Sequence, residues 1–256
     1  MLSLKDRIVF VTGASAGIGE ACARAFAAAG ADILMCARRV GRLEKLGGEL
    51  KRDFGARSHA FALDVRDREA VEQAIGGLPK DWKAVEVLVN NAGLSRGLDK
   101  LHEGLVSDWD EMIDANVKGL LYVSRAVIPG MVERGRGHVI NIGSIAGREV
   151  YPKGNVYCAT KYAVRALSTG MRLDLNGTPV RITEIAPGLT ETEFSLVRFH
   201  GDAGRAEKVY QGYTPLRPED IADAAVWCAT RPLHVNIAEM LVLSTDQAST
   251  TLVHRK

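Results

Sequence analysis

Long apolar runs and a charge excess of one sign are both missing from this sequence. No apolar stretch approaches the roughly 20 residues that a membrane-spanning helix needs, and the N-terminus lacks the apolar core of a signal peptide. We therefore expect a soluble cytoplasmic protein with no membrane partner. The net charge of +2, without a basic stripe interleaved with aromatic residues, argues against nucleic acid as a partner.

Paired cysteines are missing as well. Cys22, Cys36, Cys158 and Cys228 are widely spaced, with no Cys-x-x-Cys pair and no cluster of histidines nearby. This spacing predicts free thiols in a reducing compartment and no metal site. For Cys158 we expect a small buried apolar residue rather than a reactive thiol.

What the sequence does contain is typical of a globular α/β protein. Apolar residues make up 46% and charged residues 25%, and no linker-like segment divides the chain, so residues 1–256 are predicted to form one domain. Apolar strand-like runs alternate with helical stretches, which predicts a doubly wound parallel sheet of Rossmann type with helices on both faces. The expected strands are 7–12, 31–37, 58–63, 85–89, 138–142, 180–185 and 238–243; the expected helices include 20–29, 40–54, 108–134 and 218–230.

A glycine-rich turn follows the first expected strand. Its pattern, Gly13-Ala14-Ser15-Ala16-Gly17-Ile18-Gly19, places three glycines between a strand and a helix. In that context glycines allow a tight turn and close backbone approach, and the helix N-terminus holds a pyrophosphate. A plain tight turn is the alternative for the loop taken alone.

Two arginines, Arg38 and Arg39, end the second expected strand. An NAD site usually carries an acidic residue about here to bind the ribose 2′-hydroxyl. Guanidinium groups suit a 2′-phosphate instead, so we expect NADP. The alternative is a solvated helix start, because Arg42 and Lys45 follow.

Polar residues mark three further positions. Asp64, at the end of a strand, either accepts from an adenine amino group or caps the next helix. Asn90 begins Asn90-Asn91-Ala92-Gly93, where small residues let the backbone turn under a cofactor and amides pin neighbouring strands. Asn116, inside a long helical stretch, either bonds its own backbone, marks a kink or is exposed at the surface.

Tyr157 and Lys161 lie four residues apart in an expected helix, which places them on the same face. A tyrosine with a pKa of about 10 is a poor base at neutral pH. A nearby ammonium group favours the phenolate and makes the tyrosine a usable acid or base. Ser144 ends a strand thirteen residues earlier, near enough for a loop to bring the two hydroxyl groups together.

Taken together these motifs resemble the short-chain dehydrogenase/reductase family along essentially the whole chain. The matching elements are Thr12 to Gly19, Asn90 to Gly93, Asn116, Ser144, Tyr157-x-x-x-Lys161 and Pro187-Gly188. Within the family the sequence is most similar to the NADP-dependent 3-hydroxy acid dehydrogenases, through Arg38-Arg39, residues 143–161, residues 186–199 and Thr245-x-Gln247-Ala248-Ser249.

The resemblance implies a role for each catalytic residue. Tyr157 is the expected general base, and Ser144 is expected to hold the substrate oxygen. Lys161 is expected to lower the tyrosine pKa and to bind the nicotinamide ribose. Asn116 is expected to hold a water that links Lys161 to solvent.

It also implies the cofactor contacts and the assembly. The expected NADP ligands are Gly13, Ser15, Gly17, Ile18, Gly19, Arg38, Arg39, Asp64, Val65, Asn90, Ala92, Gly93, Tyr157, Lys161, Pro187, Gly188, Thr190 and Thr192. A homotetramer packed through the two long helices is implied as well.

The substrate class implied is a small 3-hydroxy acid such as L-serine, L-allo-threonine or 3-hydroxyisobutyrate. A buried carboxylate favours an arginine partner, and Arg148 and Arg198 are the candidates; a salt bridge is the alternative for each. Arg198 lies in a mobile-looking segment, residues 190–213. The competing functions are a carbonyl reductase for another ketone and a non-enzymatic NADP(H)-binding regulator.

Overall fold

The computed structural model describes residues 2–256. Its centre is a seven-stranded sheet in the order β3-β2-β1-β4-β5-β6-β7, with every neighbouring pair parallel. The doubly wound sheet predicted from the sequence is therefore confirmed. The strands are β1 Ile8–Thr12, β2 Asp32–Ala37, β3 Ser58–Ala62, β4 Val85–Asn90, β5 Gly137–Ile142, β6 Val180–Pro187 and β7 Glu239–Val242.

Four of the seven strands are buried along their whole length. All residues of β1, β2, β5 and β6 are buried, whereas β7 at one edge alternates between exposed and half-buried positions. The inner strands of a parallel sheet need such continuous apolar runs, because helices cover both of their faces.

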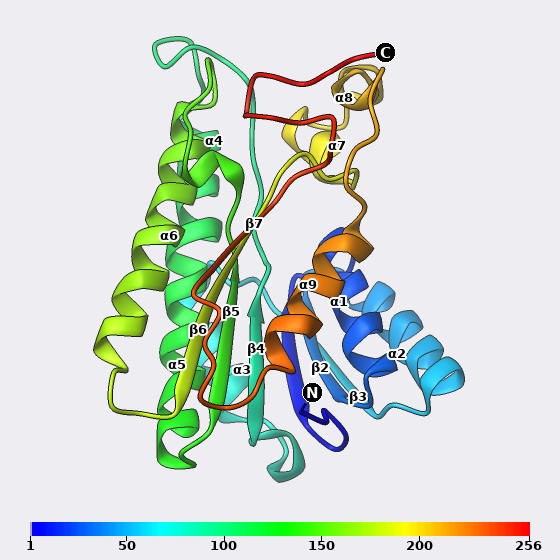
Figure 1. Cartoon of the computed structure of the whole chain (residues 1–256), viewed down its shortest axis with the longest axis vertical. Coiled ribbons are helices and arrows are strands. Elements are labelled where there is room, and N and C mark those ends of the chain that lie inside the picture. The colour runs from blue at the N-terminus through cyan, green and yellow to red at the C-terminus, as the bar shows by residue number, and fades with distance from the viewer. Residues whose placement is uncertain (1) are drawn as a thin grey trace.

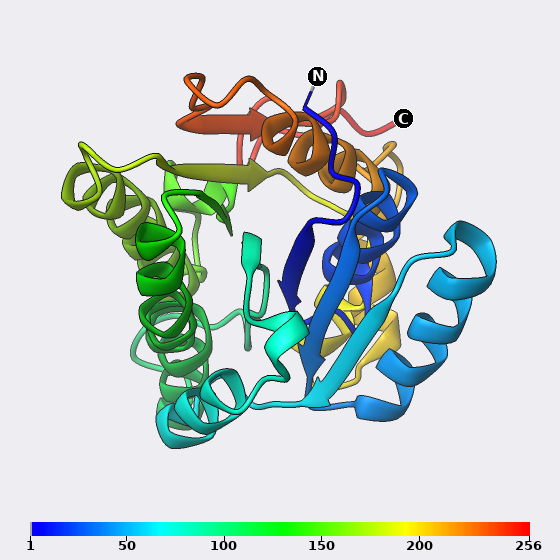
Figure 2. The same cartoon turned by 90° about the horizontal axis from the view of Figure 1, so that it is seen from below.

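Helices cover both faces of the sheet (Figures 1 and 2). One hydrophobic core lies between the sheet and α1, α2 and α9, and a second lies between the opposite face and α3, α5 and α6. The helices are α1 Gly17–Ala28, α2 Val40–Phe54, α3 Arg68–Gly76, α4 Val106–Ile113, α5 Leu120–Glu133, α6 Asn155–Asp174, α7 Phe194–Arg198, α8 Ala203–Tyr210 and α9 Pro218–Ala229. Within residues 2–256, none of these helices is both long and apolar enough to span a membrane.

Two expected segments differ in detail. The predicted helix over 108–134 consists of α4 and α5 joined by a π-helical segment, Asp114–Gly119. The mobile-looking segment contains two short helices, α7 and α8, which lie beside the C-terminal tail at one end of the sheet (Figure 1). α7, α8 and the C-terminal tail lie over the carboxyl ends of the strands, which is the edge where ligands bind in open α/β sheets.

Candidate active site

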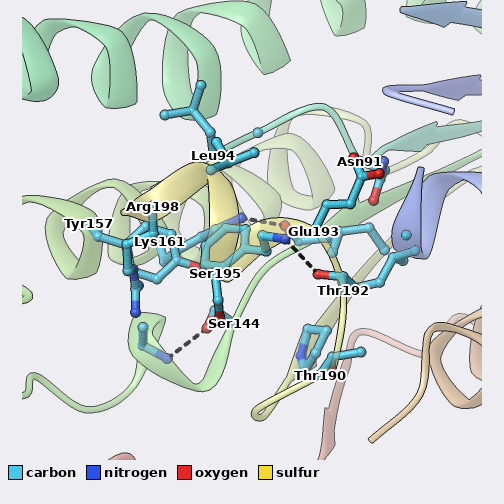
Figure 3. A pocket seen from close by; sticks show the side chains of 18 of the residues that line it. Asn91, Leu94, Ser144, Tyr157, Lys161, Thr190, Thr192, Glu193, Ser195 and Arg198 are labelled. Atoms are coloured by element: carbon cyan, nitrogen blue, oxygen red, sulfur yellow. Dashed lines mark hydrogen bonds between the residues drawn. The ribbon is translucent and has the colours of Figure 1, made fainter. Parts of the chain in front are cut away.

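A cavity of about 690 Å³ follows the carboxyl edge of the sheet. Its floor comes from the turns after β1, β2, β3, β4, β5 and β6. Its outer wall comes from residues 189–217 and 244–256, which we call the substrate cover. Figure 3 shows Ser144, Tyr157 and Lys161 on one side of this cavity and Thr192 and Glu193 farther along it.

The glycine turn forms one end of the cavity. Gly17 begins α1 with φ of +56°, a left-handed conformation that favours glycine. Gly19 packs against the turn: a Cβ there would lie 2.5 Å from the carbonyl oxygen of Gly13 and closer still to the Asn91 amide. Gly19 does not line the cavity; it packs helix against strand, and its cofactor contact stays a prediction.

The predicted 2′-phosphate arginines also line the cavity. Arg39 donates from Nε and Nη2 to Ser15 Oγ at 3.3 and 3.2 Å, which ties the end of β2 to the glycine turn. Its Nη1 donates to Glu193 at 2.9 Å. Arg38 has a side chain that is 55% exposed. Both guanidinium groups are therefore accessible to an anion at this end of the cavity.

Asp64 lines the cavity beside Val65. The helix cap that was the alternative for Asp64 is made by Asp67, whose side chain accepts from Ala70 N. Asp64 instead accepts from the backbone and side chain of Arg66. Burial acts to raise the pKa of Asp64, but the bonds from Arg66 outweigh it, so the pKa is lowered. Its contact with adenine stays a prediction.

Asn90 does not line the cavity. Its amide donates to Ser124 Oγ and to Asn141 Oδ1, both at 2.9 Å, inside the protein. The Asn90 amide thus has the other role expected there, joining neighbouring elements, and the ribose contact stays a prediction. Asn91 supports the glycine turn instead, through Nδ2 to the Thr12 carbonyl at 2.9 Å.

Tyr157 lies in the first turn of α6 and faces the cavity (Figure 3). Burial raises the pKa of its hydroxyl, while the Arg198 cation and a hydrogen bond with Ser144 act in the opposite direction. Ser144 follows β5, and its Oγ also accepts from Ala146 N at 3.1 Å, which fixes its side chain. The structure thus brings the two predicted hydroxyl groups together.

Lys161 lies one turn further along α6 and is buried. Its Nζ donates to the Ile142 carbonyl at 2.9 Å and lies 5.9 Å from the centre of the Tyr157 ring. Burial lowers the lysine pKa to about 8, and the buried carboxylate of Glu184 acts against that change. At neutral pH the ammonium form therefore persists beside the tyrosine.

Asn116 is 2% exposed, which excludes the surface alternative. It lies in the π-helical segment, a feature frequent at functional sites. Its side chain accepts from Leu94 N at 2.8 Å and donates to the Leu94 carbonyl and to Thr160 Oγ1. Thr160 Oγ1 in turn donates to the Tyr157 carbonyl at 2.7 Å. Asn116 therefore positions the loop and helix around the tyrosine, and its role toward a water stays a prediction.

The two candidate arginines occupy different environments. Arg148 donates to Glu184, which is fully buried, at 3.2 and 3.0 Å, and to Glu239 at 2.9 Å. It does not line the cavity. This corrects the prediction of a substrate contact for Arg148 and favours the salt-bridge alternative.

Arg198 does line the cavity. Its guanidinium carbon lies 5.2 Å from the centre of the Tyr157 ring, and the group donates to Ser95 Oγ at 3.0 Å and to Tyr151 OH at 2.8 Å. A cation is thus held next to the predicted acid/base residue, on the side facing the substrate cover.

Of the residues predicted from the sequence, only Gly19, Asn90, Asn116 and Arg148 lie outside the cavity lining. Those that line it are Gly13, Ser15, Gly17, Ile18, Arg38, Arg39, Asp64, Val65, Ala92, Gly93, Ser144, Tyr157, Lys161, Pro187, Gly188, Thr190, Thr192 and Arg198.

Several residues of the site were not predicted. Ser95 and Tyr151 orient Arg198, and Gln247 Oε1 accepts from Leu189 N at 2.8 Å, which fixes the turn after β6. The C-terminal residues 250–255 contribute to the wall. Tyr151 and Gln247 did carry a signal, because both belong to the segments through which the sequence resembles the 3-hydroxy acid dehydrogenases. Across residues 2–256 no group of His, Cys, Asp or Glu is arranged to hold a metal ion.

Comparison with known families decides the classification. Residues 7–201 match the family model described as short chain dehydrogenase. The chain belongs to the short-chain dehydrogenase family. It is 49% identical over 251 residues to the NADP-dependent 3-hydroxy acid dehydrogenase YdfG of Escherichia coli strain K12, covering 97% of this chain and 100% of that relative.

Two further members of the family are informative. Sulfoacetaldehyde reductase 2 of Chromohalobacter salexigens is 44% identical over 242 residues, with 94% of this chain and 95% of that relative covered. A solved structure described as the closed form of serine dehydrogenase complexed with NADP+ has a TM-score of 0.91 and 49% identity, covering 97% of this chain and all of that chain. The family predicted from the motifs is confirmed.

Proposed function

We propose that this short-chain dehydrogenase is an NADP-dependent oxidoreductase of small 3-hydroxy acids such as L-serine, L-allo-threonine and 3-hydroxyisobutyrate, or reduces the matching semialdehydes. The observation that carries the proposal is Arg198. Its guanidinium lies 5.2 Å from the centre of the Tyr157 ring inside the cavity, so a carboxylate bound to it presents the neighbouring hydroxyl group to the tyrosine.

The cavity residues fit NADP. The N-terminus of α1 at Gly17 offers backbone N–H groups to a pyrophosphate. Arg38 and Arg39 offer planar forks to a 2′-phosphate. The turn after β6, with Pro187, Gly188, Thr190 and Thr192, lines the cavity together with Tyr157 and Lys161 and would hold the nicotinamide end.

The protein groups then divide the chemistry among them. When bound, the nicotinamide supplies the acceptor for a hydride from the substrate carbon. Ser144 hydrogen-bonds the substrate oxygen, and Tyr157 takes the hydroxyl proton as a general base. Lys161, charged below about pH 8, and Arg198 both favour the tyrosinate that this step requires.

Formation of NADPH by the purified protein tests the proposal. NADP and NAD are each tried with L-serine, L-allo-threonine, D-threonine and 3-hydroxyisobutyrate. We expect turnover with NADP and a preference for one acid. If none of the four acids gives NADPH, and NADPH-dependent reduction of uncharged ketones or diketones is seen, the hydroxy-acid assignment is contradicted and the carbonyl-reductase alternative is supported.

The variant Arg198→Met tests the carboxylate clamp directly. Loss of a charge-assisted hydrogen bond of about 1.5–3 kcal/mol predicts a KM for the acid raised about 10- to 100-fold. Arg205→Met is the matched control, because Arg205 stacks on Phe199 from α8 without lining the cavity. An unchanged KM in Arg198→Met for every acid that turns over excludes Arg198 as the clamp.

A sulfonate is a second candidate for the anionic end of the substrate. The relative named sulfoacetaldehyde reductase 2 is 44% identical to this chain, and a guanidinium binds a sulfonate in the same forked geometry as a carboxylate. Adding 2-hydroxyethanesulfonate to the panel separates the two: a KM well below that of every hydroxy acid assigns the sulfonate.

We also propose a cytoplasmic homotetramer packed through the long helices. Support comes from apolar side chains that α5 and α6 leave exposed: Leu121 at 37%, Tyr162 at 39% and Leu173 at 70%. Exposed apolar patches mark interaction sites. Light scattering on the purified protein tests the assembly, and a monomeric mass contradicts it.

A further inference from the structure

One carboxylate, that of Glu193, accepts from two arginines at the predicted 2′-phosphate end of the cavity. Arg39 Nη1 donates to Oε2 at 2.9 Å and Arg42 Nη1 donates to Oε1 at 2.8 Å. These hydrogen bonds lower the pKa of Glu193, and the bond from Arg42 has the larger effect. Exposed ion pairs contribute little singly but more as a network, and here Arg39 is also held by Ser15.

Glu193 stands between two functional elements. Its arginine partners lie at the start of α2, next to the glycine turn, whereas Glu193 itself is the N-cap residue of α7. One turn of α7 separates it from Arg198, which lies against Tyr157. The same short helix also carries Phe194, whose ring meets Tyr157 edge-on at 5.6 Å.

Charge and donor counts leave room for a phosphate beside Glu193. Arg39 and Arg42 carry two positive charges and Glu193 one negative charge, so a surplus of one positive charge remains. Arg38, whose Nη1 lies 4.0 Å from Glu111 Oε1, adds a further guanidinium toward the charge of about −1.5 to −2 of a phosphate monoester at pH 7. Arg39 Nη1 and Nη2 each keep a second N–H. Glu193 therefore orients the guanidinium groups without neutralising the site, and groups oriented in advance bind at a lower entropic cost.

We propose that Glu193 is a positioning residue that couples recognition of the 2′-phosphate to the placement of α7 and Arg198, so that NADP and the anionic substrate bind cooperatively. The inference rests on the proposed function for its two ligands. Coupling between two sites is reciprocal and typically amounts to 5- to 150-fold in affinity. The 2′-phosphate thus selects the position of α7 that presents Arg198 to the substrate.

The test compares Glu193→Gln with the wild-type protein and with Glu207→Gln. Glu207, in α8 of the same segment, makes no ion pair among residues 2–256. Dissociation constants of NADP and NAD are measured by titration without substrate. We expect Glu193→Gln to reduce the NADP preference about tenfold and to raise the substrate KM with NADP about tenfold, with kcat changed much less. Glu207→Gln keeps both values.

A merely structural role weakens NADP and NAD equally and leaves their ratio unchanged, which overturns the proposal. Tighter NADP binding in Glu193→Gln also overturns it, because the carboxylate then competes with the phosphate. The cofactor titration needs no substrate, so it tests the role of Glu193 in recognition of the 2′-phosphate even if no hydroxy acid turns over. Wild-type preference for NAD would instead refute the proposed function.

Discussion

The cofactor edge of the sheet and the substrate cover are built in opposite ways. Four of the strands that end at the cofactor edge, β1, β2, β5 and β6, are buried along their length, and their turns meet at fixed backbone positions. In the cover, α8 contains no buried residue. Polar side chains hold it instead: Ser195 Oγ donates to Tyr210 OH at 2.8 Å, which donates to the Thr190 carbonyl at 3.0 Å.

The contrast separates two requirements of the same enzyme. Hydride transfer needs a fixed geometry, which close packing of the sheet provides. Substrate entry and exit need a part that opens at little free-energy cost, and a cover with few buried apolar contacts meets that need. Tyr157 lies where the two regions meet, between Ser144 on the sheet side and Arg198 on the cover side.

The largest expected effect is at this meeting point. Tyr157→Phe removes the proton acceptor while keeping the ring against Phe194 and Arg198. We expect kcat to fall about 10²- to 10⁴-fold with little change in NADP binding. Rate measurements paired with a cofactor titration check this, and activity within a few-fold of wild type would assign the proton transfer to another group.

Next in size is Arg148→Met, which tests whether that residue belongs to the sheet side. Removing the arginine leaves the fully buried Glu184 without its cation, so we expect a loss of about 3–5 kcal/mol in the free energy of unfolding. The control is Arg165→Met, whose pair with Glu239 is long and exposed. Urea denaturation measures both, and a raised substrate KM with unchanged stability would return Arg148 to the substrate site.

The buried Lys161, on the sheet side, should make the free energy of unfolding depend on pH. Burial lowers its pKa in the folded protein from 10.5 to about 8, so between these values the unfolded chain binds more protons and stability rises with pH. Relative to Lys161→Met, the wild-type protein should gain up to about 3 kcal/mol from pH 8 to 10.5, at about 1.36 kcal/mol per pKa unit. Parallel stability curves for the two proteins in that window would contradict the shifted pKa.

The smallest effect compares one substitution in the two regions. Gly19→Ala adds a Cβ 2.5 Å from the Gly13 carbonyl oxygen, and we expect a loss of about 1–3 kcal/mol in stability together with weaker NADP binding. Gly204→Ala in α8 meets only Asp202 at an ordinary 3.6 Å and is expected to stabilise by up to about 1 kcal/mol. Equal losses from both, seen by thermal unfolding, would erase the distinction between the regions.

The same contrast explains what the sequence predicts. Strands buried on both faces are continuous apolar runs, so their order of appearance and most of their ends follow from the residues alone, as does α2 at Val40–Phe54. Tyr157, Lys161 and Ser144 belong to short local patterns and were predicted correctly as neighbours. The sequence makes Arg148 and Arg198 equal candidates for binding a substrate carboxylate. In the structure the bonds of Arg148 to the buried Glu184 distinguish the two.

Long-range polar pairs leave no local pattern. The bonds of Glu193 to Arg39 and Arg42, and of Arg198 to Ser95 and Tyr151, join segments far apart in the chain. Such pairs depend on how the cover folds back over the sheet.

The π-helical segment Asp114–Gly119 sets a rule for insertions and deletions in this helix. Removing one of its residues would let α4 and α5 merge into a regular helix with little rotation of one against the other, because the wider π-helical turn absorbs one extra residue. Asn116 would then face away from Leu94 and Thr160, which it now bridges. A single-residue deletion here would thus keep the two helices packed as they are while removing the bridge that Asn116 makes beside Tyr157.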